Sequence, residues 1–220
     1  MEEKSQGVLL QSIPYLGRQK ILKIFMPENG LVSLIVKSAN PALTALTSPF
    51  CIAEWVYKKG QKEIHTLKDG SLLDNLLELR INYDTLAAAG AMAQDLLRSQ
   101  LPSKRAPALF DLFCAYLKKS AHFAKPAILA ASFRLKLLQH EGLLSLQKEC
   151  SSCASFAVHL HQGESYCPYH APFPGLTFTA EEWETLHLLA FARQFSLFQH
   201  LVHAPLEKIS ALFEERIGLR

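Results

Sequence analysis

The chain has 220 residues, of which 49% are hydrophobic and 20% are charged. This content is enough for packed cores, which excludes a disordered chain, and the length allows one large domain or two or three small ones. No apolar run approaches the roughly 20 residues of a membrane span, and residues 1–4 lack the basic-then-apolar order of a signal peptide. We therefore expect a cytoplasmic protein that does not enter membranes.

The net charge of +3 conceals an uneven distribution along the chain. Residues 18–68 carry eight Lys and Arg against three acids, a net of +5, and residues 98–136 carry eight against one, a net of +7. From residue 141 onward, five bases oppose nine acids, a net of −4. This distribution is typical of a surface that faces a polyanion, and equally of solvated faces with no partner. Charge counting alone does not separate the two.

The first 70 residues have the pattern of short strands separated by turns. Five strands are expected, at Gly7–Ile13, Arg18–Met26, Leu31–Lys37, Phe50–Lys58 and Lys62–Lys68. Five strands in about 70 residues predict a small closed barrel of the OB type, which binds nucleic acid across one face and its loops. We assign this barrel to residues 1–80.

After Asp84 the hydrophobic period changes from two to between three and four, which predicts a helical domain over residues 81–220. The apolar stripes are Leu86, Ala89, Ala93 and Leu97, then Leu109, Phe110, Phe113, Cys114 and Leu117, then Ile128, Ala131, Leu135 and Leu138. Gly142 suits the C-terminal cap of the third helix. Thr179 and Glu182 form a capping box at the start of another helix, and a last helix is expected near Pro205.

Two ligand pairs with metal-binding spacing interrupt the helices. Cys150 and Cys153 have two residues between them, and so do Cys167 and His170, with 13 residues separating the pairs. Two such knuckles supply the four nitrogen or sulfur ligands of tetrahedral zinc. Because all four positions are filled, no water remains for the metal to activate, so we expect a structural zinc ion within a module of residues 148–172.

The other cysteines and histidines have simpler interpretations. Cys51 and Cys114 lie in apolar stretches and are expected to be small buried hydrophobic residues. His159 and His161 are reserve ligands for the zinc site, and the alternative to the whole site is that its cysteines are incidental. The chain has no Walker loop, no Gly-x-Ser-x-Gly and no Gly-x-Gly-x-x-Gly, so we do not expect an enzyme.

The order of these elements and several short motifs resemble the RecO family of bacterial recombination mediators. The resemblance rests on the opening segment 7–10, on Arg18 to Phe25 followed by residues 29–32, and on residues 133–138 leading to Gly142 before the cysteine pair. It implies an N-terminal OB-fold, a helical domain and a zinc module. It also implies a protein of the cytoplasm and nucleoid that binds single- and double-stranded DNA and anneals complementary strands. With RecR, such a protein helps to load recombinase onto DNA coated with single-stranded-DNA-binding protein.

The resemblance supports Arg18, Lys20, Lys23 and Lys37 as phosphate contacts. Family members carry a basic run after the third strand, whereas residues 37–43 here contain one lysine. We therefore expect the next basic section to take a larger share of DNA binding, through Arg98, Lys104, Arg105, Lys118 and Lys119.

The helix beginning at Pro126 suggests a second partner. Its apolar and basic residues could accept the acidic, Phe-terminated tail of single-stranded-DNA-binding protein, and core packing is the alternative for each apolar one. These candidate residues are Phe133, Arg134, Lys136, Leu137 and Leu138. The main rival to a DNA-annealing mediator is a non-catalytic, zinc-stabilised adaptor in a repair or transcription complex, and a third hypothesis is a zinc hydrolase.

Overall fold

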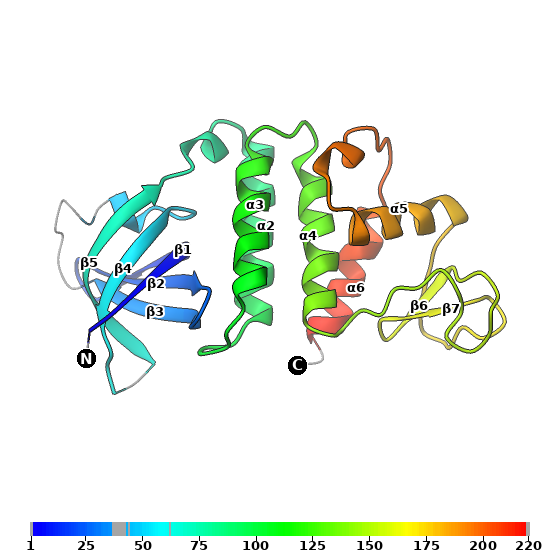
Figure 1. Ribbon diagram of the computed structural model, residues 1–220, viewed down its shortest axis with the longest axis horizontal. Coiled ribbons are helices and arrows are strands. Elements are labelled where there is room, and N and C mark those ends of the chain that lie inside the picture. The colour runs from blue at the N-terminus through cyan, green and yellow to red at the C-terminus, as the bar shows by residue number, and fades with distance from the viewer. Residues whose placement is uncertain (1, 37–42, 44, 62, 219–220) are drawn as a thin grey trace. The chain divides into compact units, whose positions relative to one another are not determined.

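The computed structural model describes residues 2–36, 43, 45–61 and 63–218 (Figure 1). The chain forms two compact units, residues 1–121 and residues 122–220, and each is described by itself. Among the described residues, no helix is both long and apolar enough to cross a membrane.

Five strands close into a barrel in the first unit. They are β1 (Glu2–Tyr15), β2 (Gln19–Met26), β3 (Gly30–Val36), β4 (Ile52–Lys58) and β5 (Ile64–Asp74). Their order around the barrel is β1-β2-β3-β5-β4, and all neighbours are antiparallel except β3 and β5, which pair in parallel. The predicted five-stranded barrel is confirmed.

Alternation of side chains fills the barrel. Along β3, buried and half-buried residues alternate from Gly30 to Val36, as expected of a strand with one face on a core. The largest side chain inside is Trp55, which is fully buried and donates its indole N–H to the Gly7 carbonyl at 3.0 Å. That bond satisfies the ring's one polar atom, so burial of the indole adds apolar packing without an unpaired donor.

Helices continue the first unit. They are the short 3-10 helices η1 (Ala45–Thr47) and η2 (Leu77–Arg80), and the α-helices α2 (Tyr83–Ser99) and α3 (Pro107–Ser120). The sequence placed a domain boundary at residue 80, where strands give way to helices. That domain boundary stays a prediction. By compactness the chain divides after residue 121, and the segment between α2 and α3 is bonded to the barrel: Ser103 N–H donates to Asn29 O and Ala106 N–H to Pro27 O, each at 2.9 Å.

The predicted stripe on α2 is wrong at its two ends. Leu86 is 37% exposed and Leu97 is half-buried, while Met92 and Leu96 are fully buried. The buried face contains Ala89 and Ala93 from the predicted stripe, together with Met92 and Leu96 in place of its two ends. A spacing of three to four residues is compatible with either set.

The second unit is mainly helical, with a small sheet. Its elements are α4 (Pro126–His140), β6 (His159–His161), β7 (Glu164–Tyr166), β8 (Leu176–Thr177), α5 (Ala180–Phe191), the 3-10 helix η3 (Phe195–Phe198) and α6 (Leu206–Gly218). Helix α4 packs against both α5 and α6 (Figure 1). The sequence signals at its ends are confirmed, since Pro126 lies in the first turn and Gly142 follows the helix at φ 68°. The capping box of Thr179 and Glu182 is also present.

Gly30 offers a test of the close approach between barrel and helices. It has φ +61°, and a Cβ there would lie 2.7 Å from the carbonyl oxygens of Leu101 and Lys104. Gly17 has φ +65° with nothing within 4 Å of a Cβ. We expect Gly17→Ala to lower the free energy of unfolding by about 1 kcal/mol, from backbone strain alone, and Gly30→Ala by about 2–4 kcal/mol. Urea unfolding measures both, and equal destabilisation would contradict the close approach.

Candidate metal centre and nucleic-acid interface

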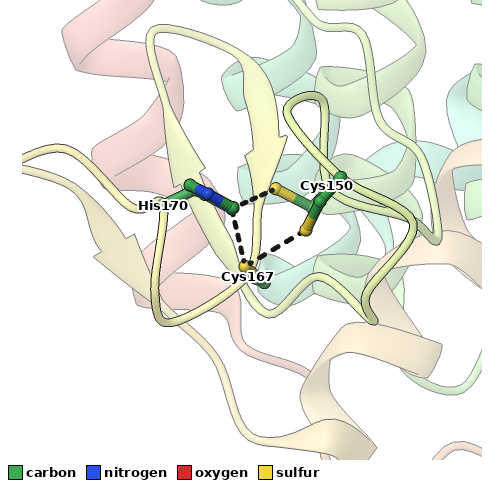
Figure 2. Close-up of side chains that lie close together, drawn as sticks. Cys150, Cys167 and His170 are labelled. Carbon is green, nitrogen blue, oxygen red and sulfur yellow. Dashed lines mark hydrogen bonds between the residues drawn. The ribbon is translucent and has the colours of Figure 1, made fainter.

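The two ligand pairs meet at the β6–β7 hairpin. Cys150 and Cys153 precede β6, while Cys167 directly follows β7 and leads to His170. Each pair forms the same tight turn, with Cys153 N–H donating to Cys150 O at 3.2 Å and His170 N–H to Cys167 O at 3.1 Å. These turns point the ligand atoms inward, and Figure 2 shows the side chains of Cys150, Cys167 and His170 converging.

The separations of the ligand atoms fit a tetrahedral metal ion. All four lie within 4.8 Å of one another. The Cys153 and Cys167 sulfurs are 3.8 Å apart, and His170 Nδ1 lies 3.8 Å from Cys150 Sγ and 3.3 Å from Cys167 Sγ. Bonds of about 2.3 Å to sulfur and about 2.0 Å to nitrogen imply edges of about 3.5–3.8 Å in a tetrahedron. The group can therefore hold a metal ion.

The local electrostatics also favour a cation. Desolvation raises the pKa of the Cys150 thiol, but backbone N–H donors, including Ser152 N–H at 3.4 Å, outweigh it and bring the pKa to about 6. The pKa of His170 is raised because the Cys153 and Cys150 sulfurs accept its hydrogen bonds. Thiolate is the form that ligates metals. The pKa of the Cys153 thiol is also lowered, chiefly by a hydrogen bond from the Ser155 side chain, whereas desolvation raises the pKa of Cys167. Cys150 and Cys153 thus favour the thiolate form that a metal ion binds.

The remaining sulfur and imidazole groups considered from the sequence lie elsewhere. His159 Nδ1 pairs with Thr177 Oγ1 at 2.9 Å, and His161 Nδ1 lies 2.5 Å from Pro174 O. Cys51 is fully buried and Cys114 is half-buried, and burial raises the pKa of each thiol to about 12. The ligand group is therefore the one predicted, without the reserve histidines.

The Cys153→Ser variant tests the metal group. It removes one ligand, so we expect metal content to fall well below one ion per chain. We also expect the thermal midpoint to fall by about 10 °C, since a destabilisation of about 2 kcal/mol moves the midpoint of a domain of about 100 residues by that much. Elemental analysis and calorimetry measure the two quantities. Ser152→Ala is the matched control, because Ser152 contributes its backbone N–H and not its side chain. Unchanged metal content and midpoint in Cys153→Ser would contradict the site.

The basic residues predicted on the barrel have distinct surroundings. Arg18 is exposed in the turn between β1 and β2. Lys20 and Lys23 are half-buried on β2, where Lys20 Nζ bonds Thr47 Oγ1 at 3.2 Å and Lys23 Nζ bonds Ser33 Oγ at 2.8 Å. Lys37 lies outside the described residues.

The basic residues predicted beyond the barrel belong to the same compact unit. Arg98 is exposed at the end of α2, and Lys104 is half-buried after it. Arg105 pairs with Glu28, Nε to Oε2 at 2.5 Å, where the helical segment meets the barrel. Near the end of α3, Lys118 lies 3.9 Å from Asp74, and Lys119 is half-buried. All eight described residues of the predicted DNA-binding set therefore lie within residues 1–121.

The candidates on α4 are core residues or are bonded to neighbouring helices. Phe133, Leu137 and Leu138 are fully buried, so they pack in the core, which was the alternative for each of them. In the described part of the chain they offer no apolar surface to a partner. Arg134 bonds Ser210 Oγ at 2.8 Å, and Lys136 donates to two carbonyls near the end of α5 at 2.9 and 3.0 Å. The space of the expected apolar groove is filled because α4 packs against both α5 and α6. Binding of an acidic tail by this helix stays a prediction.

A cavity beside Lys23 was not foreseen. It has a volume of about 370 Å³ and is lined by parts of β2, β3, β4, β5 and the end of α2. Residues so far apart in the chain carry no common motif. The one signal in the sequence is that Glu63 and His65 are two residues apart in the predicted strand Lys62–Lys68, which puts them on the same face of that strand.

A closed five-stranded barrel followed by helices and a Cys3His group defines a class of multidomain protein with a metal-binding knuckle. The comparisons with known proteins narrow this class. The family model described as "Recombination protein O N terminal" matches residues 1–76, and "Recombination protein O C terminal" matches residues 80–213. The chain belongs to the RecO family of DNA repair proteins.

Individual relatives agree with the family models. The chain is 30% identical over 217 residues to a DNA repair protein RecO of Chlamydia trachomatis serovar L2, covering 94% of this chain and 89% of the relative. It is also 30% identical to the protein of that name from Chlamydia pneumoniae, covering 94% and 86%. A more distant relative, from Exiguobacterium sibiricum, is 26% identical over 180 residues, covering 77% and 71%.

Proposed function

We propose that this protein is a recombination mediator that binds single- and double-stranded DNA and anneals complementary strands. Together with RecR, it would help to load recombinase onto DNA coated with single-stranded-DNA-binding protein. The observation that carries the proposal concerns the predicted DNA-binding residues. All eight of them that the structure describes lie in the same compact unit as the barrel, which the family's N-terminal model matches.

The charge of that unit suits annealing. Residues 1–121 contain fifteen Lys and Arg against eleven Asp and Glu, a net of +4, whereas residues 122–220 contain eight against nine, a net of −1. Two complementary strands repel each other through their phosphates, so pairing is faster on a surface that neutralises both backbones. Phosphate contacts of this kind position DNA without reading its sequence, as annealing of any pair of strands requires.

The proposal includes zinc as the metal and a structural role for it. Three thiolates and one imidazole form a ligand set typical of zinc, and filling all four positions leaves no site for a reacting water. A zinc ion bound by such a ligand set stabilises the fold. A closed ligand set supports a protein without enzymatic activity. From the family's role in DNA repair, we further propose that the protein works in the cytoplasm with the nucleoid.

Cobalt substitution tests the closed ligand set. Protein reconstituted with Co²⁺ in place of zinc is expected to bind one ion per chain and to show thiolate charge-transfer bands with the visible spectrum of a tetrahedral complex. Elemental analysis of the native protein identifies the resident metal. A five-coordinate spectrum that changes with pH would instead indicate an open position and support the zinc hydrolase.

Strand annealing tests the proposed activity. We expect the zinc-replete protein to bind single-stranded DNA with an affinity that falls steeply with salt, and to accelerate pairing of complementary oligonucleotides. Arg18→Glu combined with Lys20→Glu should reduce the salt slope, log Kd against log salt, by about 0.7 for each phosphate that the variant no longer neutralises. Lys148→Glu is the control, because this exposed lysine lies in the second unit beside Glu184.

The rival adaptor function predicts a different result. If the protein neither shifts single-stranded DNA at low salt nor accelerates annealing, the mediator proposal fails and the adaptor is favoured. Repeating the assay on DNA coated with single-stranded-DNA-binding protein, with and without RecR, tests both proposed protein partners.

A further inference from the structure

The cavity in the first unit is large enough for a small ligand. Its volume of about 370 Å³ falls within the range of about 300–1,000 Å³ that is typical of small-molecule sites. The barrel supplies most of its wall, and the end of α2 with the segment after it supplies the rest. Polar and aromatic side chains from several strands meet there, as is usual for a specific site.

Two stacked rings form part of the wall. The rings of Tyr57 and His65 are parallel to within 4°, with centroids 5.6 Å apart, and both line the cavity. The Tyr57 hydroxyl accepts a hydrogen bond from Asn29 Nδ2 at 2.8 Å and donates one to Glu3 Oε2 at 2.9 Å. Burial raises the Tyr57 pKa to about 12, so the phenol stays neutral. Burial and two hydrogen bonds hold the Tyr57 ring in place, and the stacked Tyr57 ring in turn fixes the plane of the His65 ring. The His65 side chain remains partly exposed.

Charges of both signs lie around these rings. Lys23 projects from β2 with Nζ bonded to Ser33 Oγ at 2.8 Å, which uses one of its three N–H donors and leaves two for a ligand. Lys59 is paired with Glu3 at 2.6 Å. The exposed Glu63 also lines the cavity and supplies a carboxylate acceptor.

We propose that this cavity binds one nucleotide, with its phosphate on Lys23, its base against His65, and Glu63 favouring bases that carry an amino group. A base has a planar ring that stacks on an aromatic side chain, and stacking of this kind is a main source of affinity for unpaired strands. Carboxylates accept hydrogen bonds from the amino group of cytosine, which thymine lacks. An acidic peptide fits less well, because its carboxylates offer no planar ring to stack on His65 and no amino group to donate to Glu63.

This inference rests on the proposed function for the source of the nucleotide, which is an unpaired DNA strand. It adds a discrete site with a base preference to a surface that otherwise contacts phosphates. A free mononucleotide has the same chemistry, so the experiment includes both sources.

The experiment titrates the full-length, metal-replete protein with dCMP and with dTMP, following backbone amide signals by NMR. We expect saturable shifts at Ser33 and His65, with dCMP bound about tenfold more tightly than dTMP. Lys23→Ala should weaken dCMP binding about tenfold, since it removes hydrogen bonds to a charged group. Glu63→Gln should abolish the preference, because an amide can pair with either base. His65→Phe keeps a stacking ring and should retain binding, whereas His65→Ala should lose it.

Lys58→Ala is the matched control, because Lys58 is an exposed neighbour of Lys59 with the same charge. It should leave dCMP affinity unchanged, and unaltered amide spectra away from the cavity will show that each variant is folded. Displacement of dCMP by a dC oligonucleotide would identify a DNA strand as the source. Binding of dCMP without such displacement would identify a free nucleotide, and either result supports the site.

Three results would overturn the inference. The first is that dCMP affinity is unchanged in both Lys23→Ala and His65→Ala. The second is that deoxyribose phosphate binds as tightly as dCMP. The third is that an acidic peptide, but not dCMP, shifts the amide signals of Ser33 and His65. Annealing that persists in a protein that fails to bind dCMP would remove this site and leave the proposed function intact. Binding of dCMP by a protein that does not anneal strands would support this site and remove the proposed annealing function.

Discussion

The bonding between the β2–β3 turn and the segment after α2 makes the barrel and two helices one body. Backbone hydrogen bonds from Ser103 to Asn29 and from Ala106 to Pro27 join the two segments, and Gly30 allows this because there is no room for a Cβ beside Leu101 O. Such bonds between main chains need few particular side chains. Because of them, the cavity gains its second wall, and basic residues after α2 belong to the same unit as those on β2.

The Cys3His group offers an equivalent constraint in the segment around β6 and β7, which has only a small core of its own. Strands β6 and β7 have three residues each, and a segment of this size buries too little apolar surface to fold independently. A metal ion shared by the two knuckles would compensate, because ligation would fix both turns at once. The surrounding sequence is acidic from residue 141 onward, which suits a stabilising element better than a phosphate-binding one.

Features encoded within a few neighbouring residues could be predicted from the sequence, and features made by packing could not. Ligand spacing placed the Cys3His group correctly, and alternation with turn residues placed the five strands. Helix α4 shows the limit, since Phe133 and Leu137 have a spacing that suits either a core or a peptide groove. Ten of its fifteen residues are buried, so it is apolar nearly all round, as expected of a central helix. Sequence periodicity does not reveal which neighbours cover such a helix.

The charge pattern along the chain needs the same correction. The basic stretch 98–136 combines residues from both units, and its last three cations act within the second. Lys125 donates to Leu201 O at 2.7 Å, and Lys136 donates to Ala190 O at 2.9 Å. Arg134 lies 5.0 Å from the centre of the Phe213 ring. A half-buried ammonium bonded to carbonyls near a helix end stabilises that end, and burial lowers the Lys136 pKa. The DNA contacts proposed in this stretch are therefore drawn from the residues before 121, which belong to the unit that contains the barrel.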